Sequence, residues 1–194
     1  MVIGLDFDNV LMDFYDALHQ YHNIKFNTSV SRDKAITPNL EDLWGCTTEE
    51  MDRRIVDFYQ SEMHDNASPM SGAPEAVRKL SKENSLVVIT SRPDFIKERT
   101  LSWLNKHYSN LFDQVYFTNL YLGKSNIKSK ADACKELGVD VFVDDFISYA
   151  TDVAENGGRV LLLDAPWNQS DELHPNITRA RNWEHIMEIL NNEQ

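Results

Sequence analysis

The most constraining feature of this chain is a set of five short apolar runs that do not alternate with polar residues. The runs are rich in β-branched residues, and polar residues stop each of them: Val2–Phe7, Ser85–Thr90, Gln114–Thr118, Asp140–Val143 and Arg159–Leu163. An unalternating run is typical of a strand that is buried on both faces, as in a parallel sheet. We therefore predict five parallel core strands.

The stretches between these runs mainly carry the spacing of amphipathic helices. Apolar residues recur there every three or four positions, at 73–82, 93–107, 129–137, 148–156 and 183–191. Strands that alternate with helices predict an α/β fold, a three-layer Rossmann-like parallel sheet with helices on both faces. The 194 residues suffice for one well-buried core with a small accessory subdomain.

One interval, from Asp13 to about Met70, does not follow this alternation. It contains helical patterns at Asp13–Tyr21 and Thr48–Met63, joined by a polar connector, and no clear core strand. We interpret it as a small helical cap inserted after the first strand. The expected organisation is a core of residues 1–12 and 70–194 and a cap of residues 13–69.

Polar and charged residues gather where the predicted strands end. The first strand leads into Asp6, Asp8 and Asn9, the second into Thr90, Ser91 and Arg92, and the fourth into Asp144 and Asp145, while Lys130 begins the helix before the fourth strand. Ligands of open parallel sheets bind at this edge. So many carboxylates in one place require compensating charge, and oxygen ligands without His or Cys are typical of Mg²⁺. A lysine and a hydroxyl beside them suit a phosphate group.

Two of these carboxylates have complementary chemical uses. A carboxylate can attack phosphorus to give an acyl phosphate that water later cleaves, and Asp6 is placed for this. A second carboxyl two residues on, Asp8, can protonate the leaving oxygen and then deprotonate the incoming water.

The same residues resemble the four motifs of the haloacid dehalogenase superfamily, in their order along the chain. They are D-F-D-N-V-L at 6–11, V-V-I-T-S from 87, Lys130, and V-D-D from 143. The resemblance implies a phosphatase with Asp6 as nucleophile and Asp8 as acid/base, with the Asp8 backbone carbonyl on Mg²⁺. It also implies Thr90, Ser91, Lys130 and the Asn9 position on the phosphate, and Asp6, Asp8, Asp144 and Asp145 around the metal.

Two assignments within these motifs stay open. Where relatives carry Gly-Asp in the fourth motif, alignment makes Asp145 the direct ligand and Asp144 its supporting partner. Lys124 and Lys128 are rivals for the third motif; Lys130 is preferred because K-A-D-A-C-K-E-L-G-V-D-V-F-V-D-D reads as one helix, turn and strand.

Three further segments resemble the 5′-nucleotidase group, which includes the 5′(3′)-deoxyribonucleotidases. They are P-M-S-G-A-P-E-A-V-R-K-L at 69–80, V-V-I-T-S-R-P at 87–93 and L-L-L-D-A-P-W-N at 161–168. This resemblance implies a (deoxy)ribonucleoside monophosphate as substrate. It also makes Phe14, eight residues after Asp6, a candidate aromatic wall for the base, with Trp44 as a second candidate and core packing as the alternative for both. Asn9 departs from the glycine that relatives usually carry.

Charge and hydropathy exclude several other functions. The net charge of −12 disfavours nucleic acid as a partner, and no apolar run approaches the roughly 18 residues of a membrane span, so we expect a cytoplasmic protein. The alternative that stays open is a phosphatase of sugar phosphates, whereas the acidic charge argues against one that acts on nucleic-acid ends. A non-catalytic binding module is disfavoured because Asp6, Asp8, Thr90 and Lys130 are all present. A signalling receiver is disfavoured because its acidic pair would come first and its lysine last, whereas here the acidic pair follows Lys130. Arg92 is expected to pair with an acid such as Asp94 or to contact substrate.

Overall fold

The sheet in this computed structural model is parallel throughout. The structure describes residues 1–35, 39–118, 128–170 and 172–192. Within them the strands lie in the order β3-β2-β1-β4-β5-β6. Their bounds are β1 Val2–Leu5, β2 Ser85–Thr90, β3 Gln114–Phe117, β4 Val141–Asp144, β5 Val160–Leu163 and β6 Ile177–Ala180. The predicted parallel α/β architecture is confirmed.

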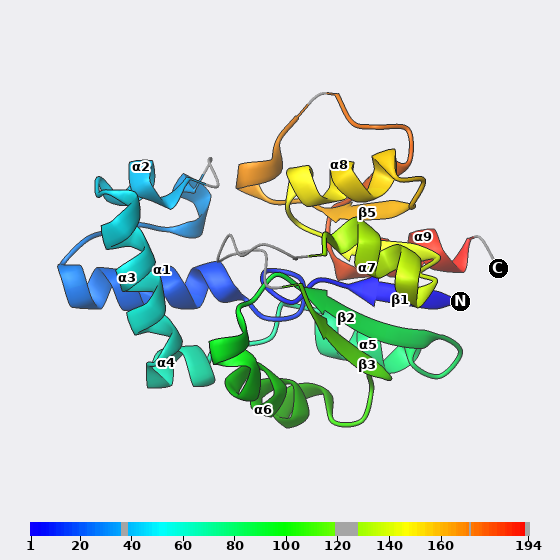
Figure 1. The fold of residues 1–194 in the computed structure, drawn as a ribbon, viewed down its shortest axis with the longest axis horizontal. Helices are drawn as coiled ribbons and strands as arrows, with labels where there is room; N and C mark the ends of the chain where they lie inside the picture. Colours follow the sequence, from blue (N-terminus) through cyan, green and yellow to red (C-terminus); the bar gives the residue numbers. More distant parts are fainter. Residues whose placement is uncertain (36–38, 119–127, 171, 193–194) are drawn as a thin grey trace.

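Helices cover both faces of this sheet (Figure 1). The core helices are α5 Ala73–Leu80, α6 Lys97–Tyr108, α7 Lys130–Leu137, α8 Ile147–Glu155 and α9 Trp183–Asn191. Successive strand residues point to opposite faces. Leu86 and Val88 of β2 therefore pack in the cluster that includes α5, α6 and α9, whereas Val87 and Ile89 pack with α7 and α8. Burial on both faces explains why the strand sequences do not alternate.

The segment between β1 and α5 is helical and lies beside the carboxyl-terminal edge of the sheet (Figure 1). We call its helices the cap helices: α1 Phe14–Phe26, α2 Leu40–Trp44, α3 Thr48–Tyr59 and α4 Glu62–Asp65. The chain enters and leaves this segment through two adjacent stretches, because Asp13 N donates to Ser68 O at 2.9 Å and Met70 N to Leu11 O at 2.8 Å. The division into a core and a cap subdomain is a proposal that this arrangement supports.

Three differences from the sequence predictions stand out beyond shifts of a few residues at element ends. A sixth strand, β6, follows β5 at the sheet edge, and the short helix α2 lies in the polar connector of the cap. The pattern at 48–63 is two helices, because Ser61 interrupts it and caps α4 by accepting a hydrogen bond from His64 N at 3.2 Å. Such a serine at a helix start satisfies an otherwise unpaired backbone donor.

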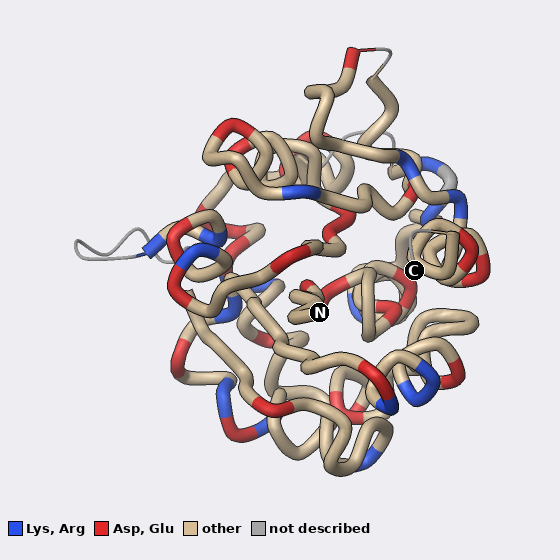
Figure 2. Tube along the Cα trace, turned by 90° about the vertical axis from the view of Figure 1, so that its right-hand side faces the viewer, with Lys and Arg blue, Asp and Glu red and all other residues tan. Residues whose placement is uncertain are grey.

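Acidic residues are spread over most parts of the described chain, and Lys and Arg residues are fewer (Figure 2). Among the described residues, none of the helices has the length and hydropathy needed to cross a bilayer.

Candidate active site

The candidate site lies where the strand order reverses. β1 pairs with β2 on one side and β4 on the other, with Leu5 level with Val88 and Val143. Asp6 therefore leaves β1 in the crevice between the two halves of the sheet, and its backbone N–H donates to Val143 O at 2.9 Å. Such a crossover point is where open α/β sheets bind their ligands.

Lys130 is the central cation of this crevice. Its ammonium lies 2.8 Å from Asp6 Oδ1 and 2.8 Å from Asp144 Oδ2, and the side chain is buried. The start of α7 is fixed by a capping box in which Ser129 and Asp132 exchange backbone and side-chain hydrogen bonds. The sequence therefore sets where the lysine leaves the helix.

Three buried carboxylates surround this one lysine. One oxygen from each of Asp6, Asp144 and Asp145 lies within 4.8 Å of the others. Burial raises the pKa of Asp6 to about 7, against the lowering effect of Lys130. Burial also raises the pKa of Asp145, and the neighbouring Asp144 and Asp6 raise it further. The site thus has an excess of negative charge, and its all-oxygen donor set fits a divalent cation such as Mg²⁺.

The two acids that follow one another at the end of β4 have different surroundings. Asp144 is fully buried and accepts hydrogen bonds from Lys130 Nζ and, at 2.7 Å, from Phe146 N. Asp145 lines the adjoining cavity, and its Oδ2 accepts from Trp167 Nε1 at 2.8 Å. Asp145 thus faces the space where a ligand would bind, while Asp144 holds Lys130.

Asp8 also lines this cavity, and its carboxylate is paired with Arg92. The guanidinium donates from Nη2 to Oδ1 at 2.7 Å and from Nε to Oδ2 at 3.0 Å. The expected ion pair of Arg92 is therefore made with Asp8, 84 positions earlier in the chain, and not with the neighbouring Asp94.

The cavity has a volume of about 280 Å³ and a largely apolar and aromatic wall beyond the acids. It is lined by Asp6, Asp8, Asn9, Phe14, Tyr15, Leu40, Glu41, Met51, Ile55, Tyr59, Ser91, Lys130, Asp145, Phe146 and Tyr149. Residues from α1, α2 and α3 form one side, so the cap helices complete the pocket. Phe14, a predicted pocket residue, is part of this wall.

Trp44, the other predicted pocket residue, is not brought to the cavity. Its ring stacks on His22 of α1, with centroids 4.3 Å apart and planes 15° apart, and it is largely buried. Trp44 is the last residue of α2, and its side chain points toward the other cap helices. It packs in the core of the cap, which is the alternative given for Trp44 in the sequence analysis.

The predicted phosphate ligands lie at different depths. Ser91 lines the cavity, and its buried Oγ has no hydrogen-bond partner among the described residues. Thr90, at the end of β2, is buried and accepts from Arg92 N at 3.2 Å; it is not among the lining residues. An unpaired buried hydroxyl is costly, so Ser91 fits a ligand oxygen.

Asn9 lines the cavity in a left-handed backbone conformation, with φ of 58°. Glycine favours this conformation, and asparagine tolerates it. Its N–H donates to Met12 O at 2.7 Å, and its Oδ1 accepts from Tyr15 N at 2.9 Å. The backbone N–H of Asn9 is therefore already used within the turn, and the side-chain Nδ2 is the donor of Asn9 that is left for a phosphate at the predicted position.

The rival lysines of the third motif do not reach the described site. Lys128 is exposed and pairs with Glu136, and Lys124 lies outside the described residues. Sequence reasoning missed the role of Trp167, although it lies within the quoted segment L-L-L-D-A-P-W-N; only the fold brings its indole to Asp145. It also missed the cavity tyrosines Tyr15, Tyr59 and Tyr149, which carry no motif signal.

Comparison with known proteins agrees with this fold and shows the family of the chain. The chain matches the family described as 5′ nucleotidase, deoxy (pyrimidine), cytosolic type C protein over residues 1–193. A nucleotidase of Clostridium acetobutylicum is 25% identical over 191 residues, which cover 97% of this chain and 92% of that protein. A haloacid dehalogenase-like hydrolase of Streptococcus pneumoniae superposes with a TM-score of 0.71 at 16% identity, over 100% of this chain and 98% of the other. YfnB of Bacillus subtilis, in a structure with bound magnesium, gives 0.66 at 13% identity, over 98% of each chain.

The fold, the acidic crevice and these relatives define a phosphoric monoester hydrolase of the haloacid dehalogenase superfamily. Within that superfamily, the chain belongs to the cytosolic type C 5′-nucleotidase family.

Proposed function

We propose that this enzyme is a Mg²⁺-dependent 5′-nucleotidase that hydrolyses (deoxy)ribonucleoside monophosphates through an aspartyl phosphate on Asp6. The observation that carries the proposal is the buried group of Asp6, Asp144, Asp145 and Lys130, which opens onto an aromatic-walled cavity. Family membership supports a nucleotide as substrate. A cytoplasmic location accords with the family's description.

In this proposal Asp6, Asp145 and the backbone carbonyl of Asp8 hold the metal. Asp145 is the direct ligand of the acidic pair because it faces the cavity, and Asp144 keeps the Lys130 ammonium beside the phosphate. A bound divalent cation would supply positive charge to the phosphate oxygens and to the carboxylates.

The first step transfers the phosphoryl group to the protein. An Asp6 carboxylate oxygen attacks phosphorus, the bond from phosphorus to the leaving oxygen breaks, and Asp8 gives a proton to that oxygen. Lys130 neutralises the phosphate, and the Ser91 hydroxyl and Asn9 Nδ2 donate hydrogen bonds to it. Thr90 lies behind the lining residues of the cavity. Its hydroxyl oxygen accepts a hydrogen bond from Arg92 N, so in this proposal its hydroxyl proton is donated to a phosphate oxygen.

The second step restores the enzyme. A water molecule attacks phosphorus and passes its proton to Asp8, and the bond between phosphorus and Asp6 breaks, releasing inorganic phosphate. The leaving nucleoside occupies the apolar side of the cavity, where Phe14, Tyr15 and Tyr59 offer flat surfaces to a base.

A substrate panel tests this proposal. Nucleoside and deoxynucleoside 5′-monophosphates and sugar phosphates are compared by kcat/KM, with Mg²⁺ and with EDTA. We expect nucleotides to exceed sugar phosphates by at least tenfold and EDTA to abolish turnover. A sugar phosphate hydrolysed faster than every nucleotide would refute the substrate assignment, and full turnover in EDTA would refute the metal dependence.

A further inference from the structure

We propose that Arg92 is a positioning residue that fixes the carboxyl group of Asp8 for proton transfer, and that His64 and Thr100 hold Arg92 in place for this task. The inference rests on the proposed function, because the acid/base role of Asp8 is itself a proposal.

The contact between Arg92 and Asp8 is a bidentate hydrogen-bonded ion pair. Nη2 donates to Oδ1 at 2.7 Å, and Nε donates to Oδ2 at 3.0 Å and to Oδ1 at 3.2 Å. Two parallel donors of a rigid planar guanidinium fix the plane of a carboxylate, which the single ammonium of a lysine does not do. Asp8 therefore has one orientation toward the cavity.

The location of Arg92 excludes direct contact with substrate as its role. Arg92 is 2% exposed, whereas a quarter of the Asp8 side chain is exposed. Asp8 lines the cavity, and Arg92 is not among the lining residues. The guanidinium lies with its carbon 4.2 Å from the centre of the Phe7 ring, in the interior beneath Asp8.

The remaining nitrogen of Arg92 is held from two sides. Nη1 donates to Thr100 Oγ1 of α6 at 3.0 Å and contacts His64 Nε2 of α4 at 3.1 Å. Thr100 in turn donates to Ile96 O at 3.0 Å. A buried ion pair is by itself weak evidence for a contribution to stability. In this ion pair every nitrogen of the guanidinium has a directed partner, so the orientation of Arg92 is fixed.

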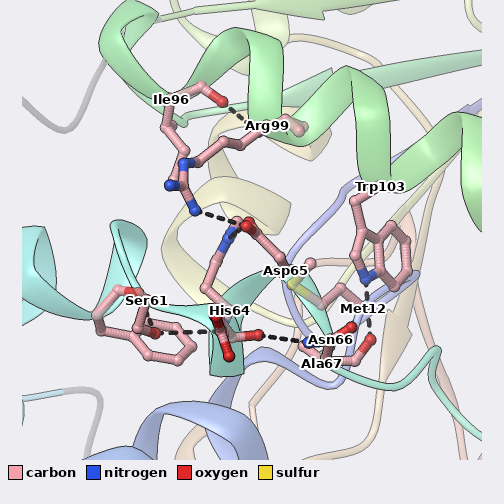
Figure 3. Close-up of polar contacts among 12 residues, drawn as sticks. Met12, Ser61, His64, Asp65, Asn66, Ala67, Ile96, Arg99 and Trp103 are labelled. Carbon is pink, nitrogen blue, oxygen red and sulfur yellow. Dashed lines mark hydrogen bonds and ion pairs between the residues drawn. The ribbon is translucent and has the colours of Figure 1, made fainter.

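His64 can accept from Arg92 only when its Nε2 carries no proton. Burial and the neighbouring Arg92 lower the pKa of His64 to about 4, so the ring is neutral near neutrality. Its Nδ1 donates to Asp65 Oδ1 at 3.1 Å, and Asp65 pairs with Arg99 at 2.7 Å. Figure 3 shows His64 and Asp65 of α4 beside Arg99 and Trp103 of α6. The cap helix α4 thus contributes to the support of Asp8.

The test compares two substrates of similar shape whose leaving groups differ in basicity. p-Nitrophenolate leaves without much protonation, whereas phenolate is a stronger base and needs a proton from Asp8. General acid catalysis contributes about 10²–10⁴-fold to a rate. In Arg92→Gln we expect kcat/KM for phenyl phosphate to fall about 100-fold and that for p-nitrophenyl phosphate to fall less than about tenfold. The inhibition constant of inorganic phosphate should be unchanged.

Thr100→Val provides a milder variant that keeps Arg92 and removes only one of its acceptors. We expect the same selective loss at about three- to tenfold, because Arg92 loses one directed partner and keeps its hydrogen bonds to Asp8 and its contact with His64. Lys106→Gln, which changes an exposed hydrogen bond from the same helix to Asn66 Oδ1, is the matched control and should leave both substrates unaffected.

Equal losses for the two substrates in Arg92→Gln and Thr100→Val would overturn the inference, because they indicate a general structural role. A weaker inhibition by phosphate would also overturn it, since Arg92 would then bind substrate. Asp8→Asn distinguishes the two proposals: if this variant shows no leaving-group selectivity, the acid role of Asp8 fails and the inference fails with it. If Asp8→Asn is selective and the Arg92 variant is not, only the inference fails.

Discussion

Acid should destabilise this protein through His64, and the size of the effect follows from its surroundings. The side chain is fully buried, and its pKa falls from an ordinary 6.5 to about 4 because of burial and the adjacent Arg92. In the unfolded chain the same ring takes up a proton below about pH 6.5. The unfolded state therefore binds more protons between these two values, and the free energy of unfolding decreases as the pH falls through that window.

The magnitude can be calculated by linkage. With a folded pKa of about 4, an unfolded pKa of 6.5 and two-state unfolding, the loss between about pH 7 and about pH 5 is about 2 kcal/mol. Above about pH 7 the group contributes no further pH dependence. The Asp65 carboxylate, which accepts from His64 Nδ1, opposes the lowering of the pKa without reversing it.

Urea unfolding followed by circular dichroism, in EDTA at both pH values, measures this effect. The control is His64→Gln, whose amide oxygen can accept from Arg92 Nη1 and does not titrate. The other histidines are common to both proteins, so their contributions cancel in the difference. The wild type should lose about 2 kcal/mol more than the variant between the two pH values. Equal losses would contradict the conclusion that His64 is buried and neutral.

Two further predictions concern the metal and the pocket. Trp167→Phe removes the Nε1 donor to Asp145 Oδ2. Because the loss of a hydrogen bond that supports a metal ligand weakens metal binding, the Mg²⁺ concentration for half-maximal activity should rise about 10-fold. An unchanged Mg²⁺ titration would be inconsistent with Asp145 as the ligand. Phe14→Leu should raise KM for a nucleotide about tenfold because the base loses a stacking surface. Trp44→Leu should lower the melting temperature and leave KM unchanged. A larger increase in KM for the Trp44 variant than for the Phe14 variant, measured by steady-state kinetics, would refute the placement of the two rings.

Much of the fold could be predicted from the sequence because the central strands are buried on both faces. β1, β2, β4 and β5 consist mostly of Val, Ile and Leu, so their pattern is distinct from the helices between them. β6 was missed because it is an edge strand: Ile-Thr-Arg-Ala has an exposed threonine and a half-buried arginine at its centre. The five residues of α2 are too few to show a helical period.

The predicted site residues came from strand ends, which the sequence locates well. What the sequence could not supply were the contacts between side chains far apart in the chain. Arg92 reaches Asp8 across 84 positions, and Trp167 reaches Asp145 across 22. Each of these four residues could also make contacts with its neighbours in the sequence. Only the packing of the helices and strands determines which partner each side chain meets. Asp144 and Asp145 likewise differ in their surroundings because the fold places Lys130 against Asp144 and Trp167 against Asp145.

The aspartyl phosphate can be sought directly on Asp6. The enzyme is mixed with a deoxynucleoside monophosphate and Mg²⁺, quenched in acid within milliseconds, digested and examined by mass spectrometry. We expect one phosphoryl group on the peptide that contains Asp6, and neither that group nor phosphate release in Asp6→Asn. A phosphoryl group on another residue, or sustained phosphate release by Asp6→Asn, would contradict the account.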